Sequence, residues 1–363
     1  MNDPNLIVER MSDRCKRDSS GFCCIMKAET GRCIPLKTND KAFGWCFIGT
    51  GKLANQVASQ VCRSGRHKVV SIYTRRAESG EAFAEKHGGY YYASAREAMT
   101  APGVDAVYVV TTHDSHYDYA KLALECGKPV LVEKPFTMNA KQAKELVALA
   151  KEKHLYIAEA MWTWFGPVAN QIKEWVDTGA YGILREVSIS YCMNSKGYAD
   201  RVTDPAKAGG SLLDVGVYPI TYLYRLFGKP KSITCEGKMK NGVDLADDIT
   251  MDFGDGRVIR FRASVDDFKG FEMLKLIGTE GKTKLLLWHM ASKATLQRKL
   301  GKDVVVRGSG NYLNEFDIVS NEIRLGYTES RFVPLQCTVD VMELLDACRA
   351  QMNLYYPFET KNV

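Results

Sequence analysis

The chain has 363 residues, of which 45% are hydrophobic and 25% charged, with a formal net charge of +6. This length predicts about two domains. The basic residues are scattered among acidic ones and form no run interleaved with aromatics, which excludes a nucleic-acid groove and leaves a mild preference for anionic ligands. No stretch approaches the roughly 20 apolar residues of a membrane helix, and the N-terminus lacks the apolar segment of a secretory signal. We therefore expect a cytoplasmic protein that binds neither membranes nor nucleic acid.

Eleven cysteines are present, an odd number, and most lie inside apolar patterns. They are typical of reduced, buried cysteines in a cytoplasmic protein. Residues 1–43 are polar and weakly patterned, and they hold Cys15, Cys23, Cys24 and Cys33. Because their spacing matches neither paired zinc knuckles nor a ferredoxin run, we favour an extension that lies on the surface or on a neighbouring subunit over a metal site, and we predict no metal.

From Phe43 onward, strand and helix patterns alternate, which predicts a parallel sheet. The apolar run Trp45–Ile48 leads into Gly-Thr-Gly-Lys-Leu-Ala at 49–54, and a helical pattern follows. Such a turn lets a pyrophosphate approach the backbone at a helix N-terminus. We therefore predict a dinucleotide site that includes Gly49, Thr50, Gly51, Lys52 and Leu53.

The second strand, Val69–Tyr73, ends in Thr74-Arg75-Arg76. An NAD site usually carries an acid here for the ribose 2′-hydroxyl, whereas a hydroxyl and two guanidinium groups suit a 2′-phosphate. Alternatively, both arginines are solvated residues that begin the Ala77–His87 helix. Because a helix start disfavours cations, the sequence favours NADP over NAD, with these three residues at the phosphate.

A lysine follows the fourth named strand of this half. The strand Ala106–Val110 precedes a helix that runs through Cys126, and Pro129–Val132 then leads into Glu133-Lys134-Pro135. A helix over Asn139–Lys153 and a strand over Leu155–Ala158 follow, in a sheet expected to have six strands, five of which have definite bounds. Ligands of open α/β sheets lie at such strand ends, where a lysine can move protons. An apolar strand running directly into Lys134 argues against an ordinary surface lysine, and with the glycine-rich turn it indicates an oxidoreductase.

The second half has consecutive strand patterns without intervening helices, which predicts an open, largely antiparallel sheet in an α+β domain. Asp255-Gly256 and Glu280-Gly281 are turn signals. A helix over Ser211–Phe227 carries Asp214 and Tyr218 at positions i and i+4, on one face. We expect a division into the extension 1–43, a Rossmann domain 44–160, and a substrate-binding and dimerisation domain 161–363 that ends in a helix over Cys337–Met352. The expected strands are Leu184–Cys192, Ser232–Lys238, Asp248–Phe253, Arg257–Val265 and Phe271–Gly278.

These motifs together resemble the glucose-fructose oxidoreductase/inositol dehydrogenase (Gfo/Idh/MocA) family, from about Gly44 to Glu359. The specific motifs are Glu-Ala-Met-Trp-Thr at 159–163 and Gly-Gly-Ser-Leu-Leu-Asp-Val-Gly-Val-Tyr-Pro at 209–219, supported by Thr-Thr-His-x-x-His at 111–116 and Leu-Tyr-Tyr-Pro-Phe-Glu at 354–359. They are most similar to the branch of dimeric dihydrodiol dehydrogenases, D-xylose dehydrogenases and glucose-fructose oxidoreductase.

The resemblance implies that Lys134 faces the nicotinamide and the reacting oxygen, that Tyr218 donates or accepts the proton, and that Asp214 binds a substrate hydroxyl. It also implies a homodimer or homotetramer formed through the second sheet. Two departures from the branch are Thr112, where proline is common, and Trp164, where arginine is common; the latter puts the exact substrate in doubt. The remaining implied cofactor contacts are Thr111, His113, His116, Glu133, Lys134 and Trp162.

Physical chemistry supports a lysine–tyrosine pair. The charge of a nearby lysine lowers the pKa of a phenol, and burial lowers the pKa of the lysine. Alternatively, Tyr218 is a core tyrosine and Asp214 a helix N-cap. His113 and His116 lack further ligands at metal spacing, which favours a structural or cofactor-loop role, and His289 is interpreted as a residue of the sheet surface.

The sequence therefore predicts an NADP(H)-dependent oxidoreductase that acts on a secondary hydroxyl or carbonyl of a sugar, polyol or cyclic trans-diol. Two alternatives share the resembled fold: a glycosidase that uses NAD as an internal oxidant, and a non-catalytic sugar or dinucleotide sensor. The first would favour an acid after the second strand, and the second could lack Lys134 or Tyr218.

Overall fold

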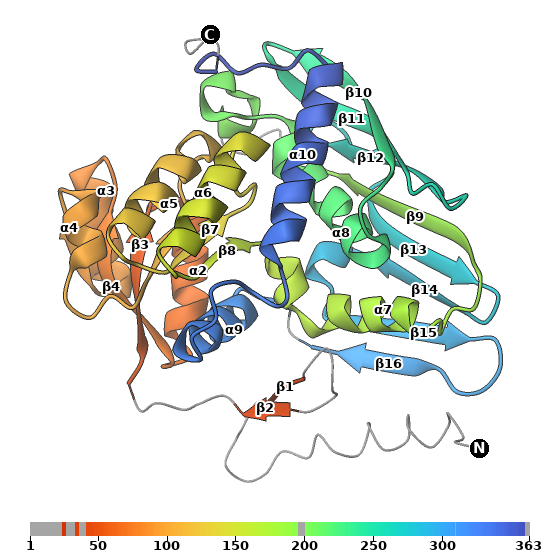
Figure 1. Ribbon diagram of the computed structural model, residues 1–363, viewed down its shortest axis with the longest axis horizontal. Helices are drawn as coiled ribbons and strands as arrows, with labels where there is room; N and C mark the ends of the chain where they lie inside the picture. The colour runs from red at the N-terminus through yellow and green to blue at the C-terminus, as the bar shows by residue number, and fades with distance from the viewer. Residues whose placement is uncertain (1–23, 27–32, 36–40, 195–199, 309, 360–363) are drawn as a thin grey trace. The chain divides into compact units, whose positions relative to one another are not determined.

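The computed structural model describes residues 24–26, 33–35, 41–194, 200–308 and 310–359 (Figure 1). The chain forms two compact units, Met1–Lys41 and Ala42–Val363. In the first, β1 (Cys24–Met26) and β2 (Cys33–Pro35) pair in antiparallel fashion. Cys15 and Cys23 lie outside the described residues, so the role of the extension stays a prediction, as does the division of the second unit near residue 160.

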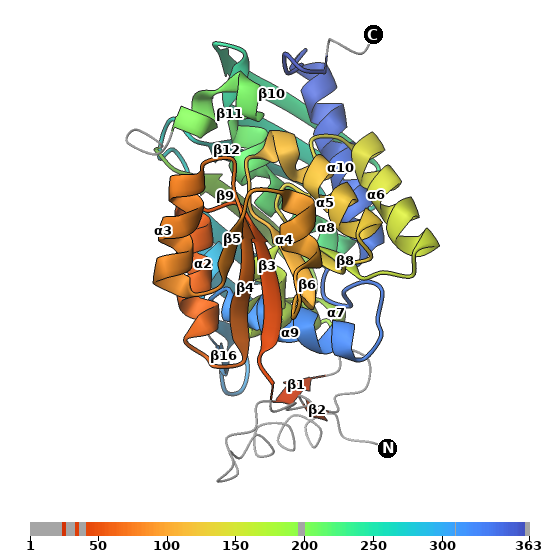
Figure 2. The same ribbon diagram turned by 90° about the vertical axis from the view of Figure 1, so that its left-hand side faces the viewer.

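The second unit begins with a six-stranded, fully parallel sheet in the order β5-β4-β3-β6-β7-β8. Helices cover both of its faces (Figure 2). This order confirms the predicted dinucleotide-binding fold, in which ligands lie at the carboxyl ends of the strands. The strands are β3 (Phe43–Ile48), β4 (His67–Tyr73), β5 (Tyr90–Tyr92), β6 (Ala106–Val109), β7 (Val130–Glu133) and β8 (Ile157–Ala160), and the helices are α2 (Lys52–Cys62), α3 (Ala77–His87), α4 (Ala95–Thr100), α5 (His116–Glu125) and α6 (Ala140–Glu152).

The sequence analysis did not locate β5 or α4, because their short pattern carries a weak periodic signal. It also placed the last strand two residues too early, since the apolar pair Leu155-Tyr156 belongs to the approach to β8.

A helix from the far end of the chain completes the core of this sheet. In α9 (Leu313–Arg324), the fully buried Phe316 packs against Trp45 with ring centroids 4.6 Å apart and against Tyr108 at 5.0 Å. The carboxylate of Asp317 pairs with His67 and Arg66 at the start of β4. The helix was not predicted, because its partners lie more than 200 residues away in sequence.

The second sheet has eight strands in the order β10-β11-β12-β9-β13-β14-β15-β16. Only the β12–β9 pair is parallel, which confirms the predicted open, largely antiparallel sheet. The last three strands were missed, because their alternation is polar and weak. The strands are β9 (Leu184–Cys192), β10 (Ser232–Lys240), β11 (Val243–Asp252), β12 (Val258–Ser264), β13 (Glu272–Gly278), β14 (Gly281–Leu286), β15 (Lys293–Arg298) and β16 (Val304–Arg307).

Three helices cover one face of this sheet: α7 (Pro167–Asp177), α8 (Val217–Phe227) and α10 (Leu335–Gln351) (Figure 1). Within the described part of the chain, no helix covers the other face. That face carries ion pairs, such as Arg262–Asp248 at 2.6 Å and Lys275–Glu186 at 2.8 Å. It is therefore a polar surface rather than an exposed core.

Helix α10 contacts the first sheet through Glu159 in β8. The Glu159 carboxyl, 2% exposed, accepts hydrogen bonds from the Phe136 N–H at 3.1 Å and from the Thr338 hydroxyl at 3.2 Å. Burial raises its pKa from 4.5 to about 7, against the lowering effect of these two hydrogen bonds.

The raised pKa of Glu159 predicts that the free energy of unfolding depends on pH. The folded state holds the proton that the unfolded chain releases above its ordinary pKa, so the free energy of unfolding falls as pH rises toward 7 and levels off above it. In Glu159→Gln the amide oxygen can accept from the Phe136 N–H and the amide N–H can donate to the Thr338 hydroxyl oxygen, and the group does not ionise. We expect the stability advantage of this variant over the wild type to grow by about 2 kcal/mol between about pH 5.5 and pH 8, in urea unfolding. Glu152→Gln, at an exposed position of α6, is the control, and an equal pH dependence in wild type and Glu159→Gln would contradict the assignment.

Candidate active site

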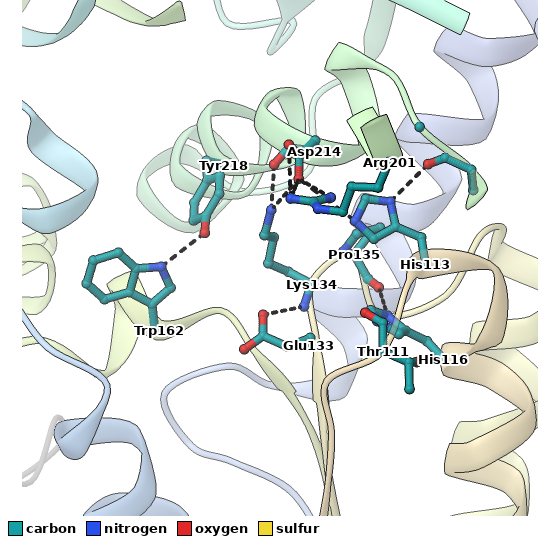
Figure 3. A network of polar contacts seen from close by, with 12 residues as sticks. Thr111, His113, His116, Glu133, Lys134, Pro135, Trp162, Arg201, Asp214 and Tyr218 are labelled. Atoms are coloured by element: carbon teal, nitrogen blue, oxygen red, sulfur yellow. Dashed lines mark hydrogen bonds and ion pairs between the residues drawn. The ribbon is translucent and has the colours of Figure 1, made fainter. Parts of the chain in front are cut away.

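The predicted catalytic residues meet where the carboxyl end of β7 approaches the start of α8 (Figure 3). The Lys134 Nζ donates to the Asp214 backbone carbonyl at 2.6 Å and to Asp214 Oδ1 at 3.2 Å. It also lies 4.9 Å from the centroid of the Tyr218 ring. Lys134, from the first half of the chain, therefore lies between Asp214 and Tyr218, from the second half.

A widened helical turn presents these two residues. The helix predicted over Ser211–Phe227 exists, but Leu212–Gly216 forms a π-helical turn before α8 begins. Such turns recur at functional sites. Pro219 has no N–H, so the carbonyls before it have one intrahelical donor fewer, and the Asp214 carbonyl accepts from Lys134 instead.

A buried carboxylate holds the start of that turn. Asp244 Oδ2, on β11, accepts a hydrogen bond from the Leu212 N–H at 2.5 Å, and Asp244 is fully buried. Gly210 has φ +122°, and a Cβ there would lie 2.1 Å from Asp244 Oδ1. The glycine pair of the motif at 209–219 thus allows the cap that positions Asp214.

Positive charge surrounds Asp214. Beside Lys134, Arg201 donates to Asp214 Oδ1 at 3.1 and 3.2 Å. Burial by itself would raise the pKa of the Asp214 carboxyl, but the charges of Lys134 and Arg201 outweigh burial and hold this pKa below its ordinary value. Asp214 is therefore a carboxylate at neutral pH that fixes the position of the lysine.

Tyr218 is 7% exposed, and its hydroxyl oxygen accepts a hydrogen bond from the Trp162 indole N–H at 3.0 Å. Burial raises the pKa of this phenol well above 10, helped by the neighbouring Tyr191 and Tyr312 and opposed by the bond from Trp162. Burial therefore outweighs the lowering effect expected from the charge of Lys134, and the pKa of the phenol lies above its ordinary value. The phenol is neutral at pH 7, with its proton available to a further acceptor.

The two histidines of the 111–116 segment hold backbone loops. His113 Nδ1 donates to the Ala208 carbonyl at 2.9 Å, and the His116 ring lies between the carbonyls of Pro135, 2.9 Å from Nδ1, and Thr111, 3.3 Å from Nε2, so that the neutral ring donates to one of the two. Burial lowers the pKa of His113 to about 3, so it is uncharged beside Asp214, and burial also lowers the pKa of His116. Both fit the structural alternative, and direct contact of either with a cofactor stays a prediction.

Glu133 supports the turn that carries Lys134. One carboxyl oxygen accepts from the Tyr108 hydroxyl at 2.5 Å and the other from the Lys134 backbone N–H at 3.2 Å. Glu133 is 4% exposed, and burial raises its pKa. Its predicted contact with a cofactor is not tested by this geometry.

The glycine-rich turn has the shape that a pyrophosphate requires. Gly49 has φ +111°, and a Cβ there would lie 2.6 Å from the Val110 carbonyl oxygen, whereas a Cβ on Gly51 would meet nothing within 4 Å. Helix α2 starts after Gly51 with no side-chain cap and no acid in its first turn. The positive end of this helix is thus open to an anion, so these residues fit a dinucleotide phosphate.

Arg75 and Arg76 follow β4 at the same edge of the sheet. Both side chains are exposed, and Arg76 is the N-cap residue of α3 without forming a capping bond. Within the described residues, neither guanidinium has a hydrogen bond or ion pair. Their position fits a 2′-phosphate, and the partly buried Thr74 precedes them.

Two further residues change the interpretation of the substrate side. His289, expected on the sheet surface, instead lies in the wall of the site: its ring is 5.4 Å from Trp162 and 5.7 Å from Tyr218. Trp164 is buried and packs against Tyr222 with ring centroids 4.8 Å apart, and the Arg225 guanidinium lies 5.1 Å from its ring. Trp164, at a position where arginine is common in the resembled branch, is thus a packing residue.

The sequence analysis missed Arg201, because no local pattern distinguishes it from other arginines. It also missed Glu272, whose role follows from its contact with His289 in the turn after β14. Among the described residues, no group of three or more His, Cys, Asp and Glu side chains could hold a metal, and no helix is long and apolar enough to cross a bilayer.

Comparison with known proteins agrees with this architecture. Residues 43–160 match the model described as "Oxidoreductase family, NAD-binding Rossmann fold", and residues 169–284 match the "GFO/IDH/MocA C-terminal domain". A 3-ketoreductase from Actinomadura kijaniata, solved with NADP and TDP-benzene, has the same fold, with a TM-score of 0.77, 21% identity, and coverage of 86% of this chain and 98% of that one.

Two curated relatives align over almost their whole length. Trans-1,2-dihydrobenzene-1,2-diol dehydrogenase of Oryctolagus cuniculus is 30% identical over 326 residues, covering 85% of this chain and 98% of the relative. D-xylose 1-dehydrogenase (NADP(+)) of Hypocrea jecorina is 27% identical over 368 residues, covering 88% and 94%. These are the enzyme types of the branch that the motifs resemble. The chain belongs to the Gfo/Idh/MocA family of oxidoreductases.

Proposed function

We propose that this protein is an NADP(H)-dependent oxidoreductase that interconverts a secondary hydroxyl and a carbonyl on a sugar, polyol or cyclic trans-diol. The observation that carries the proposal is the placement of Lys134 against Asp214 and over the Tyr218 ring, at the edge of the sheet where the glycine-rich turn opens. The relatives named above act, by name, on a dihydrodiol and on D-xylose. No specific observation favours the NAD-dependent glycosidase or the sensor.

The roles follow from the contacts. A bound nicotinamide supplies or accepts the hydride, and the protein positions the substrate and moves the proton. The Tyr218 oxygen already accepts from Trp162, so its O–H can donate to the substrate oxygen during reduction. Lys134, fixed by two bonds to Asp214, has a third N–H to direct at the same oxygen, where its charge stabilises a developing alkoxide.

NADP is the proposed cofactor. Support comes from the two exposed guanidinium groups after β4, from the NADP(+)-dependent xylose dehydrogenase, and from the NADP-bound ketoreductase. In this proposal Gly49 to Leu53 cradle the pyrophosphate, while Thr74, Arg75 and Arg76 bind the 2′-phosphate. Thr111, Lys134 and Trp162 border the nicotinamide.

The uncovered face of the second sheet supports a homodimer or homotetramer as a further part of the proposal. An open sheet has one face left for a partner subunit, and the ion pairs keep that face polar in the separated chain. Light scattering of the full chain tests it: a molar mass of one chain across the micromolar range would contradict it.

The raised pKa of Tyr218 predicts opposite pH behaviour of the two directions. Alcohol oxidation needs the phenolate as base, so kcat/KM should rise by up to about tenfold per pH unit between about pH 7 and 9, below the phenol pKa. Carbonyl reduction needs the phenol and should stay flat over the same range. Rates in both directions measure this, with Tyr218→Phe expected to lose the pH dependence of the residual oxidation. A plateau of oxidation below about pH 8 would indicate a different base.

The test of the proposed function is absorbance at 340 nm with NADP⁺ or NAD⁺ against aldoses, polyols, inositols and dihydrodiols. A substrate-dependent rise, larger with NADP⁺, is the expected result. If no substrate changes the absorbance while fluorescence titration shows that NADPH binds, the sensor is favoured.

A further inference from the structure

An aromatic wall surrounds Tyr218 on the side of the second sheet. The His289 ring stacks on Tyr191 at 4.8 Å with an interplanar angle of 29°, and it stands at 90° to Trp162. Tyr191 is itself 5.5 Å from Tyr218, between ring centroids. His289 is therefore the imidazole closest in this wall to the proposed proton donor, and the mechanism above gives it no role.

A buried carboxylate orients this imidazole. Glu272, 4% exposed at the start of β13, accepts the His289 backbone N–H at 2.9 Å and also pairs with His289 Nδ1. Because Glu272 engages Nδ1, Nε2 is the ring nitrogen left to bond a hydroxyl. Nε2 lies 3.3 Å from the Tyr191 hydroxyl, a long contact, and the side chain is 14% exposed. The ring thus holds Nε2, which can bond a hydroxyl, in a fixed position at the border of the site.

A small cavity beside this ring is lined by Trp162, Trp288, His289, Thr163 and Asn311. Thr163 Oγ1 and Asn311 Oδ1 are buried there without a hydrogen-bond partner among the described residues. Native structures leave few buried polar atoms unpaired, so these two atoms require a hydroxyl or a water. Hydrogen-bonding capacity therefore extends beyond the groups that the reacting carbon needs.

Resting on the proposed function, we propose that His289, oriented by Glu272, is a specificity-determining residue that binds a substrate hydroxyl away from the reacting carbon. Lys134, Asp214 and Tyr218 account for the reacting oxygen and one neighbouring hydroxyl, which is all that a cyclic diol offers. A ring with further hydroxyls can bond a third polar group, whereas a diol leaves that group to water. A site built to bond a hydroxyl rejects the analogue that lacks it, so the substrate class is a sugar or cyclic polyol rather than an aromatic dihydrodiol.

The first test compares rings that differ in hydroxyl number. Steady-state kinetics with NADP⁺ use D-xylose, D-glucose and myo-inositol against trans-cyclohexane-1,2-diol and trans-1,2-dihydrobenzene-1,2-diol. For the best polyhydroxylated ring, His289→Phe should raise KM by about 10- to 100-fold with kcat within about threefold, while diol kinetics change less than about twofold. His289→Gln, whose amide can reach the Nε2 position, should recover part of the loss, and His154→Asn on the surface is the control. Equal losses for polyols and diols, a lower kcat alone, or a wild type that turns over only diols would overturn the proposal.

A binding measurement separates this proposal from the proposed function. Calorimetric titration of the same sugars into the NADP⁺ complexes of wild type and His289→Phe needs no turnover. Sugar binding that is weakened by His289→Phe, in a wild type without turnover, would support the subsite and overturn the oxidoreductase. Turnover with unchanged sugar binding in His289→Phe would do the reverse, and the absence of both turnover and sugar binding would overturn both.

Discussion

Lys134→Met should reduce kcat by about 10³-fold in either direction while NADPH binding stays within about tenfold of the wild type. The substitution removes the positive charge 4.9 Å from the Tyr218 ring and the N–H groups that face the reacting oxygen. Asp214 remains paired with Arg201 at 3.1 Å, so no buried charge is left alone and the fold should persist. Single-turnover kinetics and NADPH fluorescence titration measure the two effects separately.

The matched control is Lys141→Met, on the exposed side of α6, which should leave both quantities unchanged. Turnover of Lys134→Met within tenfold of the wild type would overturn the assigned role of the lysine. Loss of NADPH binding together with turnover would instead place Lys134 chiefly at the cofactor.

The double substitution of Arg75 and Arg76 by alanine should raise the Kd of NADPH by about 10³-fold and change that of NADH by less than about threefold. Each charge-assisted hydrogen bond to a phosphate contributes roughly 1.5–3 kcal/mol, and only NADPH carries the 2′-phosphate. Both side chains are exposed, so their removal should not destabilise the fold. Titration of the two reduced cofactors by fluorescence provides the ratio.

Arg96→Ala is the control for lost surface charge, because Arg96 lies exposed on α4 of the same half. Equal weakening of NADPH and NADH in the double variant would show that the arginines act on the cofactor in general, and the argument for NADP over NAD would fail.

The first half of the fold was predictable because its signals are local. Apolar runs such as Val130–Val132 lead directly into a glycine-rich turn or a lysine, which are easy to recognise in the sequence. A parallel sheet then brings Gly51 and Lys134 to one edge. The same locality explains the gaps: β5 is three residues long, and α9 owes its place to rings in β3 and β6 that no window of sequence contains.

The candidate site was predictable in its members and less so in its electrostatics. The i and i+4 spacing of Asp214 and Tyr218 put both against Lys134, as the sequence indicates. The pKa of Tyr218 was not predictable, because its burial depends on rings from β9 and on Trp162, far apart in the chain. His289 was misassigned for the same reason, since its partner Glu272 begins a different strand.

The return of α9 to the first sheet has a consequence for how the protein is made. Until residues 313–324 have left the ribosome, Trp45 and Tyr108 have no Phe316 to cover them, and β8 has no Thr338 to meet Glu159. The half synthesised first therefore completes its core only after nearly the whole chain has been translated.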